Sequence, residues 1–261
     1  MADGGAGRLM VDLNADVGES FGAYRIGADE ELIPLVTSVN VAGGLHGGDP
    51  PTIARTVALA LANGVAVGAH PGYPDLAGFG RREMRLSKDE LASTVTYQLG
   101  AVAAFVPHQR LQHVKAHGAM YNRAASDPGF ARTLVEAIRA YDPDVIHVVL
   151  AGSEWESVAR EAGVRVAREA FADRALLPDG GLVPRSESGA VIHDTAAVAD
   201  RAVGIVVEGR ADAIDGSIVA LSADTICIHG DTPGAPALAR AVREALERAG
   251  VAIRPMRASI P

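Results

Sequence analysis

Short apolar segments alternate with longer amphipathic segments along this chain. Apolar residues recur with helical spacing in the longer segments, at residues 31–36, 51–64, 87–105, 127–141, 154–161 and 234–250. We predict strands in the shorter segments, at residues 8–14, 37–42, 65–70, 113–117, 145–151, 165–170 and 225–231. Such an alternation predicts about seven units in which parallel strands are joined by crossover helices.

The helix boundaries carry their own signals. Ser87 with Glu90 three residues later predicts a capped helix start, and Asp127 followed by Pro128 predicts another. Gly250 lies where the last helix should end. These signals agree with the apolar spacing, so both support the same set of helices.

Length and continuity favour one domain. The chain has 261 residues, which is near the roughly 250 residues typical of a single α/β barrel. No repeat, charge block or low-complexity linker divides it. We predict one (β/α) barrel domain over residues 1–261, seven-stranded and irregular, with residues 1–7 as a flexible extension. Residues 173–189 read as a long mobile loop that could cover a pocket.

Polar residues occupy one face of several predicted strands. In the first strand, Asp12, Asn14 and Asp16 alternate with apolar residues and therefore share a face. Only residues 145–151 lack such a face. Barrel enzymes place their catalytic groups at the carboxyl ends of strands, so we predict one shared site there. The same alternation turns these further residues inward: Ser38, Asn40, His70, His113, Lys115, His117, Glu169, Cys227 and His229.

Histidines and aspartates at strand ends allow two kinds of chemistry. They can hold a divalent metal that activates water, or they can act directly as general acid and base, and the sequence leaves both open. The candidates for a metal are Asp16, His46 and His70. On a strand, His113 and His117 would be about 13 Å apart, too far for one metal, so we interpret His113 as structural.

Two loops add candidate ligand-binding groups. The glycine-rich turn at residues 43–50 carries His46 and Asp49 and lets the backbone approach an anion closely. Arg81 and Arg174 lie in other loops, and a guanidinium near the histidines would suit recognition of a carboxylate.

Composition excludes several classes of function. The net charge is −8 and the pI is about 5.5, which argues against a nucleic-acid partner. No apolar run approaches the roughly 20 residues of a membrane helix, and there are no phosphate-loop, dinucleotide, zinc-protease or nucleophile-elbow motifs. The single cysteine, Cys227, excludes an internal disulfide. We expect a cytoplasmic enzyme that acts on a small molecule.

Several longer motifs resemble a known family. They read DLNADVGESFG, NVAGGLHGGDP, GAHPGYPDLAGFGRR, VKAHGAMYN, EAFADR, LVPR and ICIHGDTPGA. In this order, over residues 11–247, they resemble the lactam-utilization family of prokaryotic 5-oxoprolinase A subunits. Gly43 and Gly44 stand where that family usually has a cysteine, which we interpret as a packing difference.

The resemblance implies an ATP-hydrolysing cyclic amide hydrolase. Its expected reaction is the ATP-dependent opening of 5-oxo-L-proline to L-glutamate, together with subunits B and C. The expected catalytic residues are Asp12, Asp16, His70, Lys115, His117 and His229. Expected substrate-binding residues are Asn14, Asn40, His46, Asp49, Tyr73, Arg81, Tyr121, Glu169, Arg174 and Arg185.

Individual roles and two rival functions follow from this assignment. We assign Asp16 or His70 as the base, and His117 and His229 as acids or phosphate partners. Lys115, Arg81 and Arg174 are assigned as anion binders. The barrel is also similar to the glycoside hydrolase/deacetylase type, so a divalent-metal-dependent deacetylase or amidohydrolase is an alternative. A non-catalytic lactam-binding subunit is another.

Overall fold

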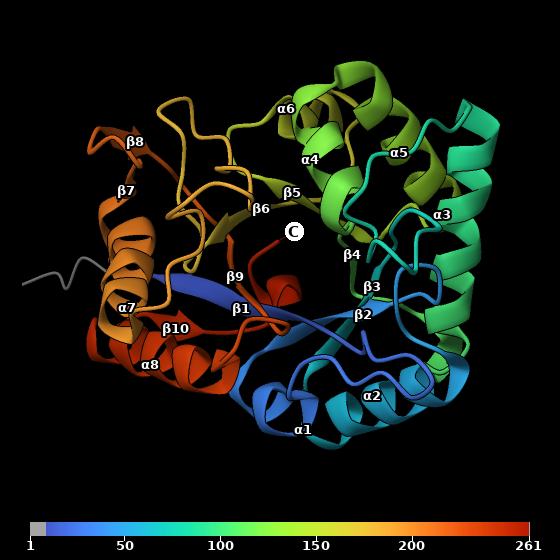
Figure 1. Ribbon diagram of the computed structural model, residues 1–261, viewed down its shortest axis with the longest axis horizontal. Helices are drawn as coiled ribbons and strands as arrows, with labels where there is room; N and C mark the ends of the chain where they lie inside the picture. The colour runs from blue at the N-terminus through green and yellow to red at the C-terminus, as the bar shows by residue number, and fades with distance from the viewer. Residues whose placement is uncertain (1–8, 261) are drawn as a thin grey trace, which may run out of the picture.

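Seven parallel strands close into a barrel, as predicted (Figure 1). The computed structural model describes residues 9–260, so the predicted extension at residues 1–7 lies outside the described residues. β1 pairs with both β2 and β9, which closes the barrel. Around the barrel the order is β1 (Met10–Val17), β2 (Ser38–Ala42), β3 (Ala66–His70), β4 (His113–Val114), β5 (Ile146–Leu150), β6 (Val166–Phe171) and β9 (Thr225–His229).

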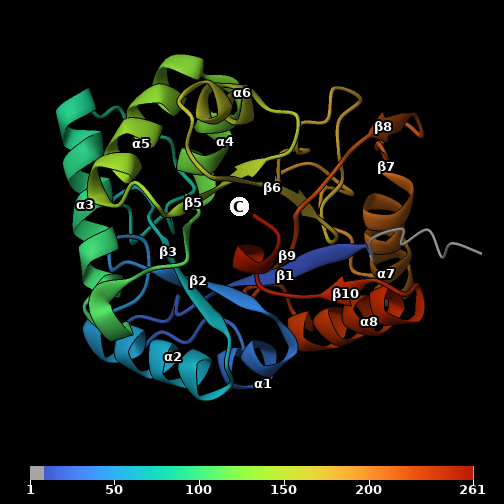
Figure 2. The same cartoon turned by 180° about the vertical axis from the view of Figure 1, so that it is seen from behind.

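Helices surround the barrel on its outside (Figures 1 and 2). Ser87 and Glu90 form the predicted capping box at the start of α3. In the part of the chain that the structure describes, no helix combines the length and apolar character needed to cross a membrane. The helices are α1 (Asp29–Leu32), α2 (Pro50–Ala62), α3 (Lys88–Ala103), α4 (Gly118–Ser126), α5 (Pro128–Tyr141), α6 (Glu154–Glu161), α7 (Thr195–Val203) and α8 (Ala235–Arg248), with short 3-10 turns η1 (Ile33–Leu35), η2 (Pro107–Gln109) and η4 (Met256–Ala258).

Residues 195–220 contain more regular structure than predicted. α7 continues into a π-helical turn, η3 (Gly204–Glu208), and β7 (Arg210–Asp212) pairs antiparallel with β8 (Ile218–Ala220). These elements are inserted between β6 and β9 and lie outside the barrel, so their sequence does not follow the strand–helix alternation. α4 was also not predicted, because its apolar residues are few.

The strand faces follow the predicted alternation. Val11 and Leu13 belong to the hydrophobic core between the barrel and its helices, while Asp12 and Asn14 are fully buried on the opposite face. β4 is shorter than the predicted strand, yet the backbone N–H of Lys115 still donates to the carbonyl of Ala69 on β3, at 3.0 Å. The side chain of Lys115 therefore points inward, as the alternation predicts.

The apolar inner face of β5 has a packing explanation. Ile146 and Val148 form a small separate hydrophobic cluster with Ala167 and Met256. Met256 begins η4, which follows the edge strand β10 (Ala252–Ile253) and lies at the centre of the barrel in both views (Figures 1 and 2). The C-terminal turn therefore packs inside the barrel, which requires apolar rather than polar residues on β5.

Candidate active site

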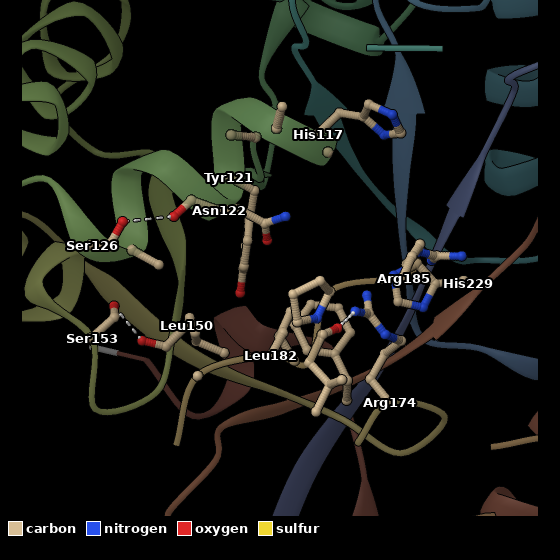
Figure 3. Close-up of a pocket in the computed structure, with 18 of the residues that line it drawn as sticks. His117, Tyr121, Asn122, Ser126, Leu150, Ser153, Arg174, Leu182, Arg185 and His229 are labelled. Carbon is tan, nitrogen blue, oxygen red and sulfur yellow. Dashed lines mark hydrogen bonds between the residues drawn. The ribbon is translucent and has the colours of Figure 1, made fainter. Parts of the chain in front are cut away.

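The carboxyl ends of the barrel strands open into one cavity of about 870 Å³. α4 and the loop at residues 177–186 contribute to its wall (Figure 3). The structure therefore brings together side chains that lie far apart in the sequence. Residues from the predicted set that line the cavity are Asp16, His70, Arg81, Lys115, His117, Tyr121, Arg174, Arg185 and His229.

Asp16 and Lys115 form a buried ion pair at the edge of this cavity. Lys115 Nζ donates to Asp16 Oδ1 at 2.8 Å and lies 3.0 Å from Glu169 Oε1. Burial opposes the ionisation of Asp16, but His70 and Lys115 outweigh it and hold the pKa of Asp16 well below 3.8. Burial also opposes the charge of Lys115, but the neighbouring carboxylates raise its pKa. Both groups are therefore charged.

A layer of hydrogen-bonded side chains supports the ion pair from inside the barrel. Asn40 Nδ2 donates to Asp16 Oδ1 at 2.8 Å and to Asn14 Oδ1 at 2.7 Å. Asp12 lies nearer the amino-terminal end of β1, where it accepts a 2.6 Å hydrogen bond from Ser38 Oγ. Burial raises the pKa of Asp12 to about 6. Asp12, Asn14 and Asn40 do not line the cavity, and Asn40 positions Asp16, which does.

Three histidines and Glu19 gather beside Asp16. His117 Nδ1 lies 3.0 Å from His70 Nε2 and 3.4 Å from Glu19 Oε1, while His46 Nε2 lies 3.5 Å from the same oxygen. The His46 and His117 rings stack, with centroids 3.8 Å apart. Burial raises the pKa of Glu19 and lowers those of His46 and His117, all by a large amount. These four side chains could hold a metal ion.

This grouping differs from the metal set predicted from the sequence. His46 and His70 do lie together, but Glu19 and His117 complete their group. Asp16 instead lies in a second group, with Cys227 and His229. Lys115 Nζ approaches both Asp16 Oδ1 and Cys227 Sγ, at 2.8 Å and 2.9 Å, so the second group already contains a cation.

His113 lies inside the barrel and away from the cavity lining. Its Nε2 is 2.7 Å from Asn40 Oδ1. The ring lies against Gly68 on β3, where a Cβ would overlap it. His113 thus fills the barrel interior and helps to fix Asn40.

His229 is oriented by Asp173. His229 Nδ1 lies 3.0 Å from both carboxylate oxygens of Asp173, and the His229 ring stacks on Phe171 with centroids 5.1 Å apart. Burial opposes the ionisation of Asp173, but His229 outweighs it and lowers the pKa of Asp173. A histidine held by a carboxylate in this way is suited to acid–base work.

Three arginines lie around the cavity. Arg174 and Arg185 are on the same side of it as His229 (Figure 3). Arg81 Nη2 is 2.6 Å from Asp231 Oδ2, and Arg185 Nη2 is 4.0 Å from Asp231 Oδ1. Arg174 donates to two backbone carbonyl groups of its own loop, at 2.5 and 3.2 Å, and burial lowers its pKa to about 10. Arg174 therefore fixes the loop, while Arg185 is freer to meet a ligand.

The remaining predicted residues have other surroundings. Asp49 caps α2, where its side chain accepts from Thr52 N, and it does not line the cavity. Tyr73 is fully buried, also away from the lining. Glu169 lies behind Lys115, and Tyr121 lines the cavity with a pKa that burial and Glu169 raise.

Some residues of the cavity were not predicted. Glu19 follows Asp16 by three residues, and Asp231 follows His229 by two, so both lie where a strand has just ended. Asn122 and Ser126 come from α4 and are four residues apart on one helix face (Figure 3). Residues four apart share a face of a helix, so the spacing of Asn122 and Ser126 predicts a common direction only if residues 118–126 are recognised as a helix.

Comparisons with known proteins match nearly the whole chain. The model of the LamB/YcsF family matches residues 11–260. The A subunit of 5-oxoprolinase from Syntrophobacter fumaroxidans is 54% identical over 247 residues, which cover 94% of this chain and 98% of that protein.

Solved structures extend the comparison to the fold. A lactam utilization protein from Thermus thermophilus superposes with a TM-score of 0.89 at 54% identity, covering 94% of this chain and 99% of that one. The T48 deacetylase shares the barrel, with a TM-score of 0.51 at 13% identity and coverage of 96% and 89%. The chain belongs to the LamB/YcsF family.

Proposed function

We propose that this chain is the A subunit of a 5-oxoprolinase, which opens 5-oxo-L-proline to L-glutamate with hydrolysis of ATP, together with subunits B and C. The name carried by its close relatives supports this role. We place the enzyme in the cytoplasm, where ATP is available.

The observation that carries the proposal is the charged Asp16 at the cavity. Its carboxylate is held between Lys115 Nζ at 2.8 Å and His70 Nε2 at 3.4 Å. A fixed carboxylate next to a histidine can take a proton from water, and a nearby ammonium can stabilise the oxyanion that forms when water adds.

ATP is needed because a lactam is a resonance-stabilised amide. Transfer of the γ-phosphoryl group to the lactam oxygen releases ADP and makes the ring carbon electrophilic. Water then adds to that carbon, with Asp16 or His70 accepting its proton. The ring C–N bond breaks as the nitrogen gains a proton, and a second water converts the resulting acyl phosphate into glutamate and phosphate.

The remaining cavity groups fit the charges of this substrate. A guanidinium binds a carboxylate through two parallel hydrogen bonds, so we assign Arg185 to the substrate carboxylate. Arg81 and Lys115 would neutralise the phosphoryl group. His229, held by Asp173 at 3.0 Å, and His117 are assigned to proton transfer at the leaving nitrogen or the phosphate.

An assay of the assembled enzyme tests the proposal. ATP hydrolysis and glutamate release should both start when 5-oxo-L-proline is added to a mixture of this chain with subunits B and C, in equal amounts. Omission of this chain should stop both. A rate of ATP hydrolysis that does not change on addition of 5-oxo-L-proline, or glutamate release without this chain, would refute the assignment.

A metal-dependent amidohydrolase or deacetylase is a second candidate. The cluster of Glu19, His46, His70 and His117 favours it, since such side chains can hold a water-activating metal. It predicts amide hydrolysis by the chain alone, independent of ATP and abolished by a chelator. The 5-oxoprolinase proposal instead predicts no hydrolysis without ATP and the partner subunits.

A further inference from the structure

Two backbone carbonyl groups fix the protons of His70 and His117. His70 Nδ1 lies 2.8 Å from the carbonyl oxygen of Lys115, and His117 Nε2 lies 2.8 Å from that of Phe79. A carbonyl oxygen can only accept, so each of these ring nitrogens must donate. In the neutral histidines the other nitrogens, His70 Nε2 and His117 Nδ1, therefore carry lone pairs.

Those two lone pairs face each other. His70 Nε2 and His117 Nδ1 are only 3.0 Å apart, and Glu19 Oε1 lies 3.4 Å from His117 Nδ1. Two lone pairs and a carboxylate oxygen at these distances repel one another. Their arrangement is stable only with a proton or a metal cation among them.

His46 adds a fourth electron-pair donor to the lone pairs of His70, His117 and Glu19. Both ring nitrogens of His46 and Glu19 Oε1 are buried without a hydrogen-bond partner. His46 Nδ1 lies against the backbone of Gly72, so its Nε2 is the nitrogen turned to Glu19, at 3.5 Å. Buried polar atoms are rarely left unsatisfied, and several in one cluster indicate a missing ion.

We propose that Glu19, His46, His70 and His117 form a binding site for a first-row transition-metal dication such as Zn²⁺. With metal–nitrogen bonds of about 2.0–2.1 Å, donors around tetrahedral zinc are separated by about 3.3 Å. The separations given above, 3.0, 3.4 and 3.5 Å, are close to that value, and a rotation of one of the stacked His46 and His117 rings would turn both nitrogens to the same ion. Three imidazoles and one carboxylate favour such a metal over Mg²⁺ or Ca²⁺, which prefer oxygen.

The hydrogen bonds to the two carbonyl groups also fit a metal site. Metal-binding histidines usually donate their second ring N–H to a carbonyl or carboxylate, which sets the tautomer and the ring direction. Here this outer layer is present for His70 and His117. By contrast, the second group already has the Lys115 ammonium against Asp16 and Cys227, so it needs no further cation.

The ion would be reachable from the cavity. Glu19, His70 and His117 line the cavity, whereas His46 lies behind them. A metal held there would occupy the lone pairs of His70 and His117, which would leave Asp16 as the base of the proposed reaction, and it would polarise a substrate oxygen or a water molecule. Its binding does not depend on the proposed lactam reaction, because uptake is measured without substrate.

Metal uptake by the tag-free full chain tests the proposal. The chain is first dialysed against a chelator and then titrated with Zn²⁺ or Mg²⁺, and bound metal is counted by mass spectrometry after gel filtration. We expect one Zn²⁺ per chain and no Mg²⁺. Co²⁺ in place of Zn²⁺ should give the visible absorption of a tetrahedral site. Glu19→Gln and His46→Ala should each weaken Zn²⁺ binding by at least about 10–100-fold, the loss typical even of outer-layer partners.

A matched control uses another buried histidine. His147 on β5 also lacks a hydrogen-bond partner but lies away from the cluster, so His147→Ala should bind Zn²⁺ like the wild type. Circular dichroism checks the fold of each variant. If His46→Ala does not fold, the nearly isosteric Glu19→Gln decides. No Zn²⁺ uptake by the wild type, a preference for Mg²⁺, or wild-type binding by the folded variants would overturn the proposal.

Discussion

Lys115 Nζ lies 2.8 Å from Asp16 Oδ1 at the edge of the cavity, and the Lys115 side chain is 2% exposed. Glu169 approaches the same ammonium at 3.0 Å. One buried cation therefore holds two carboxylates that come from opposite parts of the chain. This balance keeps Asp16 charged at neutral pH, as the proposed reaction requires.

Removal of the ammonium should destabilise the fold. Lys115→Met leaves the Asp16 and Glu169 carboxylates buried without a partner, and we expect the free energy of unfolding to fall by about 3–5 kcal/mol. Urea denaturation at pH 7 measures this change. The double variant Lys115→Met/Asp16→Asn should recover part of the loss, because it removes one of the two carboxylates. A double variant no more stable than the single one would contradict the pairing.

Asp12 should make stability depend on pH. Its pKa is raised from 3.8 to about 6 by burial, so between those values the folded chain binds a proton that the unfolded chain releases. The contribution of Asp12 to the free energy of unfolding should therefore fall as the pH rises from about 4 to about 6, by about 3 kcal/mol.

Asp12→Asn isolates this effect from the other titrating groups. The variant keeps an oxygen for Ser38 and cannot ionise, so it should gain stability relative to the wild type as the pH rises through this range. Urea denaturation of both proteins between pH 4 and pH 7 measures the difference. Parallel pH profiles would show that Asp12 is not the titrating group.

Arg185 should act on substrate binding more than on turnover. Its guanidinium is half-buried and 4.0 Å from Asp231, so it keeps donors free for a carboxylate. Loss of a charged hydrogen bond costs about 1.5–3 kcal/mol, so Arg185→Met should raise KM for 5-oxo-L-proline by about 10–100-fold. We expect kcat to stay within about twofold and Arg185→Lys to lie between. A fall in kcat with unchanged KM would assign Arg185 to the chemical step instead.

The size of the side chain tolerated at position 43 should be limited by contact with Gln98. A Cβ at Gly43 would overlap Gln98, whose side chain hydrogen-bonds both Gly72 N and Gly72 O at 2.9 Å. Gly43→Cys should therefore cost about 1–3 kcal/mol of stability through overpacking. Gly43→Cys/Gln98→Gly, which also removes the Gln98 Cβ, should be less destabilised than the sum of the two single variants, as thermal or urea unfolding of all four proteins would show. Additive losses would exclude this contact as the cause.

Much of the fold could be predicted from local pattern. The strand alternation identified the inward face of β1, including Asp12, Asn14 and Asp16, because side-chain direction on a strand depends only on parity. The Ser87–Glu90 capping box could also be predicted, because both partners are close in sequence. The seven-stranded barrel followed from the number of strand–helix units.

The details of the site could not be predicted in the same way. Which donors meet across the barrel depends on strand register and loop shape, so Glu19 rather than Asp16 joins His46 and His117. The antiparallel hairpin of β7 and β8 is an insertion whose position follows from packing outside the barrel. Asp49 illustrates the remaining difficulty, because a helix cap and a ligand-binding residue look alike in a glycine-rich turn.

The most direct test of the proposed function is glutamate release from 5-oxo-L-proline by the complete mixture of this chain, subunits B and C, and ATP, with Asp16→Asn in place of the wild type. Glu136→Gln, an exposed neutralisation on α5, is the matched control. We predict that the control releases glutamate at the wild-type rate and that Asp16→Asn falls by at least about 100-fold while keeping its fold, as loss of a general base would cause. Wild-type glutamate release by folded Asp16→Asn would contradict the assignment of this cavity as the place where the lactam is opened.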